Sequence, residues 1–131
     1  MIGLDTNVLV RNLTHDAAAQ YARAAAFIDA AANRDERFVV NTAVLCELVW
    51  VLGTAYDYSR DDIASALEQI FATAEFEIDR LDDARRALRD FRATKADFSD
   101  ALIGRINQSL GAEHTVTFGR DLKGTETFRV I

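Results

Sequence analysis

Two forms of hydrophobic patterning alternate along the chain. Short apolar segments bounded by polar residues are typical of buried strands. They predict strands at residues 2–5, 37–41, 76–79, 114–118 and 128–131. Longer segments between them combine high helix propensity with apolar residues at helical spacing. These predict helices after residue 6 and at residues 15–33, 42–56, 59–73, 81–95 and 98–111.

Capping residues support several of these boundaries. Ser59 is followed three residues later by Asp62, which is the spacing of a capping box at a helix N-terminus. Thr6 and Thr42 are N-cap residue types at the starts of two other predicted helices. Gly111 is well placed to end the helix that begins at residue 98.

The alternation of short strands with helices indicates a parallel sheet covered on both faces. We therefore expect an α/β fold, a three-layer α/β/α sandwich with a central, mainly parallel sheet of four to five strands. The expected element order is β-α-α-β-α-α-β-α-α-β-β. With 131 residues the chain has the size of one domain, so residues 1–131 are taken as a single unit. In open sheets of this kind, ligands bind at the carboxyl ends of the strands.

Composition narrows the classes of site and compartment. A single cysteine, Cys46, excludes an internal disulfide and a thiolate zinc cluster, and the two histidines are too few for a histidine-based metal site. No apolar run is long enough to cross a bilayer, and the N-terminus lacks the basic start of a signal peptide. A cytoplasmic protein with no membrane role is therefore expected. The net charge of −6 argues by itself against binding a polyanion.

Five acidic residues stand at strand ends, at helix starts or inside an apolar run. Asp5 ends the first strand, Asp121 follows the fourth, and Asp97 and Asp100 lie near a helix start. Glu47 is the one acid in the run AVLCELVWVL, where a buried carboxylate is costly unless it is compensated. A parallel fold brings such positions toward one sheet edge, where carboxylates repel one another unless a cation is bound. Ligands that are all oxygens favour Mg²⁺ or Mn²⁺.

Each of these acids also has a structural interpretation. Asp5 is suited to cap the following helix, and Glu47 to pair with an arginine or lie at a protein interface. Asp97 and Asp100 are favoured near a helix N-terminus by the helix dipole, and Asp121 is more simply a loop acid. The combination favours a metal site, because separate capping roles do not explain Glu47.

Trp50, Val51 and Leu52 follow Glu47 in the same apolar run. They form an apolar surface that we expect in the core, with a dimer contact as the alternative.

Four motifs follow one another in order along the chain: IGLDTNVLV, TAVLCELVWVL, ADFSDALIGRIN and HTVTFGRDL. They resemble the motifs of the PIN-domain family, and most closely those of the VapC toxins of bacterial toxin–antitoxin modules. The resemblance covers essentially the whole chain, and the ordered set is more specific than LDTN alone. It implies a small α/β/α fold and a Mg²⁺- or Mn²⁺-dependent endoribonuclease activity. It also implies homodimers and inhibition by a cognate VapB-like antitoxin in a hetero-oligomer.

Carried over by position, the resemblance assigns metal-binding and catalytic roles to Asp5, Glu47 and Asp100. Asp97 matches an acid that is often found in such toxins. The residues expected to line the site are Thr6, Asn7 and Thr117. In this interpretation the cation activates water for in-line attack on phosphorus and stabilises the leaving 3′-oxygen, which predicts a 5′-phosphate product.

One position departs from the family pattern. Family members often have a fourth acid where this chain has Gly119. Asp121, two residues later, either substitutes for that acid or faces solvent. The departure puts the strength of second-metal binding in question, and it leaves the three principal carboxylates in place.

The cations that RNA binding needs are clustered. Arg85, Arg89 and Arg92 follow i, i+4, i+7 spacing and form one stripe, with Arg86 and Lys95 nearby. The stripe either steers phosphate groups or is a solvated helix face whose arginines pair with neighbouring acids. Those acids are Asp82, Asp83 and Asp90. The possible RNA contacts just beyond the first and fourth strands are Arg11 and Arg120.

Three hypotheses follow from these residues. The leading one is a metal-dependent endoribonuclease toxin. The second is a catalytically weakened, PIN-like RNA- or protein-binding module that lost catalysis with the acid at position 119. The third, a phosphoacceptor receiver domain, is disfavoured because it expects paired acids after the first strand and a lysine after a late one. This chain has LDTN and VTFG at those places.

Overall fold

A computed structural model describes residues 1–131 and confirms the predicted order of strands and helices. The helices are α1 (Thr6–Thr14), α2 (Ala18–Ala32), α3 (Thr42–Ala55), α4 (Arg60–Ala72), α5 (Leu81–Ala93) and α6 (Phe98–Ser109). The strands are β1 (Ile2–Gly3), β2 (Phe38–Val40), β3 (Phe76–Ile78), β4 (Thr115–Thr117) and β5 (Phe128–Val130), and a 3-10 turn, η1, spans Arg120–Leu122. Helix α2 begins three residues later than expected. His15, with φ of 56°, ends α1 in the left-handed region and separates the two helices.

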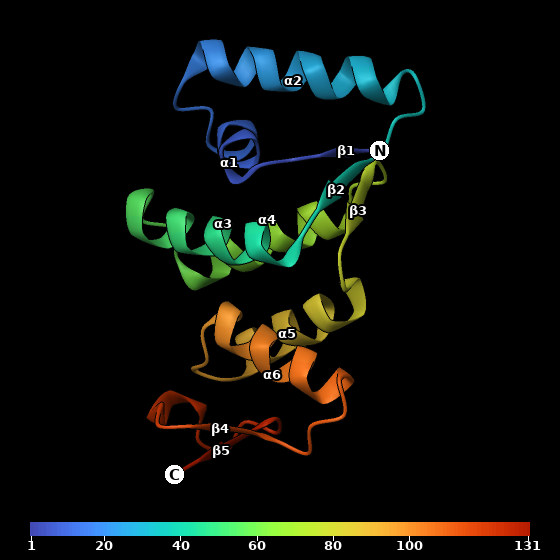
Figure 1. Ribbon diagram of the computed structural model, residues 1–131. Coiled ribbons are helices and arrows are strands. Elements are labelled where there is room, and N and C mark those ends of the chain that lie inside the picture. The colour runs from blue at the N-terminus through green and yellow to red at the C-terminus, as the bar shows by residue number, and fades with distance from the viewer.

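All the strand pairs are parallel, as predicted, and hydrogen bonds join the strands into two sheets. The first sheet has the order β1-β2-β3, with Ile2 opposite Phe38 and Phe38 opposite Phe76. The second sheet pairs β4 with β5, with Thr115 opposite Phe128. Figure 1 shows β4 and β5 beyond α5 and α6, at the opposite end of the molecule from α2. The α/β fold class is therefore confirmed, with its five strands divided three and two.

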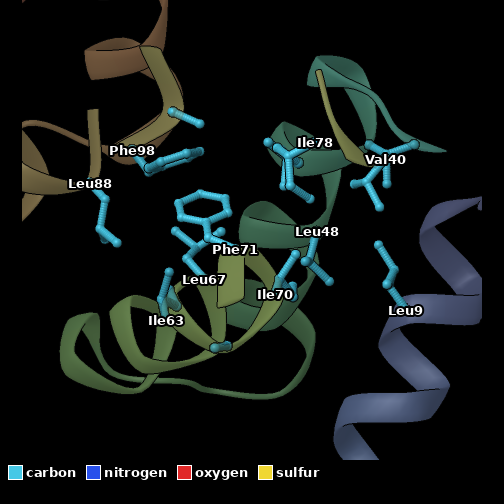
Figure 2. Close-up of a cluster of buried hydrophobic side chains, with 14 of the residues drawn as sticks. Leu9, Val40, Leu48, Ile63, Leu67, Ile70, Phe71, Ile78, Leu88 and Phe98 are labelled. Atoms are coloured by element: carbon cyan, nitrogen blue, oxygen red, sulfur yellow. The ribbon is translucent and has the colours of Figure 1, made fainter. Parts of the chain in front are cut away.

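The hydrophobic core runs through the middle of the molecule, between α1 at one end and α6 at the other. Leu9 of α1, Leu48 of α3 and Phe98 of α6 belong to one continuous cluster of buried side chains. Figure 2 shows Leu67, Ile70 and Phe71 of α4 between these helices, facing Ile78 of β3. A fully buried side chain of this size contributes about 1.5–3 kcal/mol through removal of apolar surface from water. Helices α3 and α4 therefore contribute the central side chains of the core. None of the helices has both the length and the apolar character needed to cross a membrane.

The prediction that Trp50 packs in the core was wrong. Its side chain is 69% exposed, whereas Leu52, two residues later, is fully buried and Val51 is partly buried. Because a helix advances about 100° per residue, Leu45, Leu48 and Leu52 share the buried face of α3 and Trp50 falls on another. A stretch in which nearly every residue is apolar does not identify which face of the helix is buried.

The helix caps agree with the predicted boundaries, with a shift of one residue at two of them. Asp5 caps α1, and Asn41 caps α3 by accepting a hydrogen bond from the Val44 amide at 2.9 Å. Each stands directly before the threonine that was expected to cap, in a stretch with adjacent cap-forming residue types. The Ser59–Asp62 capping box is present. Gly111, with φ of +101°, follows the C-cap of α6 as expected.

Two helical glycines give a matched test of the packing between α6 and β5. A Cβ atom at Gly104 would overlap the Thr127 hydroxyl and lie 2.6 Å from Phe128 Cε2. We expect Gly104→Ala to lower the free energy of unfolding by about 1–3 kcal/mol through overpacking. At Gly53 the added Cβ would meet Ile63 at 3.7 Å, an ordinary contact, so Gly53→Ala should be stabilising by up to about 1 kcal/mol through helix propensity. Urea denaturation measures both. Equal stability of the two variants would contradict the close approach of α6 to β5.

Candidate active site

Thr6 joins two of the predicted site acids. The side chain of Asp5 accepts a hydrogen bond from the Thr6 amide at 2.8 Å, and the Thr6 hydroxyl donates to Glu47 Oε2 at 2.9 Å. Thr6 is buried, with 4% of its surface exposed, whereas Asp5 and Glu47 are both exposed to solvent. The contact connects the carboxyl end of β1 to α3 across 41 residues of sequence. Asp5 and Glu47 therefore form one pair of acids, linked by a buried threonine.

Glu47 is exposed although it stands in an apolar run. The leucines at positions 45, 48 and 52 take the buried face of α3, which leaves Glu47 and Trp50 on the face open to solvent. A carboxylate in water bears no large desolvation cost. The apolar neighbours of Glu47 therefore anchor the helix, and the carboxylate itself is free to bind a ligand. The interpretation of Glu47 as the partner of a hidden arginine was wrong, because its hydrogen-bond partner is the Thr6 hydroxyl.

Asp97 and Asp100 form a second pair at the start of α6. Asp97 is the N-cap residue, yet its side chain makes no capping hydrogen bond, and Asp100 lies in the first turn. Burial, and secondarily the negative charge of Asp97, raise the pKa of Asp100 above its usual value. The fold thus holds two acids close together, where the charge of Asp97 disfavours the ionised form of Asp100, and a bound cation relieves this repulsion.

Arg60 holds the turn that presents this second pair. Its Nη2 atom donates to the backbone oxygens of Phe91, Thr94 and Ala96 at 2.5, 3.1 and 3.0 Å. Its guanidinium also lies 3.9 Å from the centre of the Phe91 ring. The carbonyls at the C-terminal end of α5 attract a positive charge, and Ala96 immediately precedes Asp97. Sequence reasoning missed Arg60, because nothing in the stretch SRDD distinguishes it from a solvated residue at a helix start.

The two pairs adjoin α3 at different places. Asp97 and Asp100 line a cavity of about 350 Å³ together with Trp50 and Gly53 of α3, one to two turns beyond Glu47. Glu47 does not line this cavity. No group of three or more Asp, Glu, His or Cys side chains lies close enough to hold a metal ion. The structure therefore brings the four principal acids together as two pairs rather than as one cluster.

The remaining predicted site residues lie elsewhere in the fold. Thr117 is on β4, and its hydroxyl accepts a hydrogen bond from the Gly119 amide at 3.0 Å. Asp121 and Arg120 are exposed in η1. These three belong to the β4–β5 side of the molecule, away from β1 (Figure 1). The structure does not join them to Asp5 or Glu47.

Arg11 and Asn7 of α1 line a groove of about 510 Å³ beside β1. The Arg11 guanidinium is already occupied by Asp16 at 3.1 Å and by the Tyr56 hydroxyl at 2.7 Å. A phosphate group must displace these partners to bind Arg11. Asn7 is exposed, two residues after Asp5, and its side-chain amide forms none of the hydrogen bonds of the structure.

The donor chemistry of the two pairs fits a hard divalent cation. All four principal acids supply carboxylate oxygens, and neither sulfur nor imidazole stands among them. Mg²⁺ is commonly bound through one or two carboxylates and keeps several water ligands, so a pair of acids is sufficient to hold it. The Asp5–Glu47 pair and the Asp97–Asp100 pair each meet this requirement by residue type.

Comparison with known proteins places the chain in a family. The family model described as the PIN domain matches residues 2–126. The chain is also similar to a protein of Aquifex aeolicus (strain VF5) described as "VapC ribonuclease". The two are 27% identical over 97 residues, which covers 74% of this chain and 72% of the relative.

Because the pKa of Asp100 is raised, the contribution of this residue to the stability of the protein depends on pH. Because the native state holds a proton on Asp100 more tightly than the unfolded chain does, the ionised form costs stability above the native pKa. We expect Asp100→Asn to raise the melting temperature at pH 7 by about 1–3 °C. The gain should vanish as the pH falls below the ordinary aspartate value of about 3.9.

Asp82 is the matched control for this measurement. It lies in the first turn of α5, as Asp100 does in α6, but is exposed to solvent. Asp82→Asn should lower the melting temperature slightly by removing a favourable interaction with the helix dipole. Calorimetry of both variants from pH 3 to pH 7 tests the sign. A lower melting temperature for Asp100→Asn at pH 7 would contradict the unfavourable environment of Asp100.

Proposed function

Since the chain belongs to the PIN-domain family, we propose that it is a metal-dependent endoribonuclease, the toxin component of a VapBC-type toxin–antitoxin module acting in the cytoplasm. The observation that carries this proposal is the buried Thr6, which joins Asp5 at the end of β1 to Glu47 on α3. The family match over residues 2–126 and the similarity to a VapC ribonuclease support it. Residues 1–131 act as one domain in this proposal.

The proposed roles follow the chemistry of each side chain. Asp5, Glu47 and Asp100 hold Mg²⁺ or Mn²⁺, and Asp97 assists. A bound divalent cation supplies positive charge that activates water and offsets the charge developing on the phosphodiester. Thr6 orients two of the carboxylates by donating one hydrogen bond to each. Any cation that uses three of these acids requires the two pairs to move closer together than they lie in this conformation.

Amide substitutions test the assignment directly. Asp5→Asn and Glu47→Gln each keep the shape and hydrogen-bonding capacity of the side chain but remove its charge. We expect each to lower the cleavage rate of a single-stranded RNA by at least about 100-fold, the scale of losing one preorganised electrostatic contact. The fold should remain intact by circular dichroism, because both side chains are exposed. Asp82→Asn is the control and should cleave at the wild-type rate. Wild-type cleavage by either site variant would refute the assignment.

A catalytically weakened binding module is the second candidate function. Gly119 favours it, because the chain has no acid at the position where the family often has a fourth. A side chain fits there, since a Cβ at Gly119 would meet Thr117 at 3.4 Å and Leu122 at 3.5 Å. Cleavage that requires Mn²⁺ and stops with a chelator would exclude this candidate, whereas RNA binding without cleavage at any metal concentration would establish it.

Restoring the fourth acid is expected to change metal dependence. Gly119 directly precedes η1 on the β4–β5 side of the molecule, so a cation held by the acid pairs contacts this position only in a conformation that brings β4 to them. In that conformation Gly119→Asp should lower the Mn²⁺ concentration needed for half-maximal cleavage by about threefold or more, since an added carboxylate strengthens the binding of a divalent cation. Gly119→Asn is the matched control, because it has the same shape without the charge. Asp121→Asn reports whether Asp121 already serves as that acid. Equal metal dependence of the Asp and Asn variants at position 119 would show that no cation is bound there.

The proposed partners are RNA, a VapB-like antitoxin and a second copy of the chain. Trp50, 69% exposed on α3, and Ile103, 48% exposed on α6, are apolar surface that a homodimer would cover. We expect Trp50→Glu to convert a dimer to a monomer in size-exclusion chromatography with light scattering, while Trp50→Phe stays dimeric. An unchanged dimer with Trp50→Glu would remove Trp50 from the interface.

A further inference from the structure

A second charged feature lies between α4 and α5, outside the carboxylate pairs. Arg85, Arg89 and Arg92 of α5 line a cavity of about 360 Å³, with Phe71 of α4 and Leu88 of α5 among its apolar lining residues. Seven residues of helix place the first and last arginines about 10.5 Å apart along the axis of α5. The cavity thus presents a row of guanidinium groups against an apolar wall, in a protein whose net charge is −6.

Two of the three arginines are free of protein partners. Arg92 forms an ion pair with Glu68 of α4, whose side chain also lines the cavity. Arg85 and Arg89 take part in none of the salt bridges or side-chain hydrogen bonds of the structure, whereas five other arginines form ion pairs. Those five are Arg11, Arg37, Arg80, Arg92 and Arg105.

Two of the acids expected to neutralise the stripe are engaged elsewhere, and Asp82 forms no ion pair with it. Asp83 pairs with Arg80 and accepts a hydrogen bond from Ser109. Asp90 holds the Arg105 guanidinium through two hydrogen bonds of 2.7 and 2.8 Å. The interpretation of the stripe as a face neutralised by these neighbours was therefore wrong. Unpaired arginines side by side repel one another, and an anionic ligand relieves that repulsion.

The direction of the stripe favours a nucleic-acid ligand over a lone anion. Arg92 stands near the C-terminal end of α5, five residues before Asp97, and Arg60 ties the intervening turn to α4. A chain of phosphates following the arginines along α5 therefore leads to the Asp97–Asp100 pair. Guanidinium groups bind phosphodiester oxygens through paired hydrogen bonds, which suits successive phosphates in one strand.

We propose that Arg85, Arg89 and Arg92 form a binding site for the phosphodiester backbone of single-stranded RNA, which directs the strand toward the start of α6. This inference rests on the proposed function, because it takes RNA as the substrate. Glu68 weakens phosphate binding at this site because it forms an ion pair with Arg92. Binding is governed by charge rather than by base identity, since the ligand groups are phosphates.

The test measures RNA binding without cleavage. A fluorescein-labelled single-stranded RNA is titrated with the full chain in a chelating buffer, at several KCl concentrations. For the double variant Arg85→Gln/Arg89→Gln we expect at least about tenfold weaker binding at low salt. The slope of log affinity against log salt should become shallower by about 1.4, the contribution of two single-strand phosphate contacts.

Two further variants sharpen the result. Arg86→Gln makes the same charge change on the same helix, but Arg86 does not line the cavity, so it should keep most of the affinity and most of the slope. Glu68→Gln releases Arg92 and removes a negative charge from the cavity, so it should tighten binding by about threefold or more, in line with a charged contact of modest strength. All variants alter exposed side chains, and melting curves check that each is folded.

The outcomes separate this inference from the proposed function. If the double variant loses no more affinity than Arg86→Gln, or Glu68→Gln does not tighten binding, the site is refuted, whether or not the protein cleaves RNA. If the wild type never cleaves RNA but its binding depends on the three arginines, the site stands and the proposed nuclease activity fails. Binding of a poly-glutamate peptide in preference to RNA would overturn the proposal in favour of an acidic protein partner.

Discussion

Burial of one face of α3 is the constraint on which the candidate site depends. Leu45, Leu48 and Leu52 are fully buried against the other helices and the first sheet, so the helix cannot rotate without exposing them. That orientation turns Glu47 toward Thr6 and places Trp50 in the cavity with Asp97 and Asp100. Glu47 is therefore positioned by the apolar packing of α3, whereas the turn that presents Asp97 and Asp100 is also held by the Arg60 guanidinium. The polar contacts complete an arrangement that the hydrophobic core has already set.

Charge is distributed unevenly over the fold, and the charged groups differ in how their charge is compensated. The Asp5–Glu47 pair is satisfied in part by hydrogen bonds from Thr6, whereas the Asp97–Asp100 pair has no cationic side chain bonded to it. Arg60 is directed to backbone carbonyls instead and stabilises the turn before Asp97. In α5, Arg85 and Arg89 are unpaired cations that line the cavity against α4. Unbalanced acids and unbalanced arginines in one small protein suit a ligand that carries phosphates and is processed with a divalent cation.

Predictions from the sequence succeeded where the signal was local and failed where it depended on orientation. The order of strands and helices, the Ser59–Asp62 capping box and Gly111 at the end of α6 were all correct, because each depends on residues within a few positions of one another. Trp50 was assigned to the core because every neighbour in its run but one is apolar, so periodicity could not reveal the outer face. The acids predicted to pair with the arginine stripe were wrong for the same reason, because the direction of a side chain depends on tertiary packing. Acids at helical spacing were available, but Asp83 and Asp90 turn toward other groups.

By itself, the sequence determined the α/β class, the parallel strands, and the helices with most of their boundaries to within a few residues. These follow from propensity, capping and hydrophobic spacing, which act over short stretches of chain. Only the tertiary structure decided that the strands form two sheets, that Thr6 joins Asp5 to Glu47, and that Arg60 clamps a turn more than 30 residues away. Such contacts depend on the relative placement of whole helices, and that placement results from packing over the entire core. No local pattern encodes it.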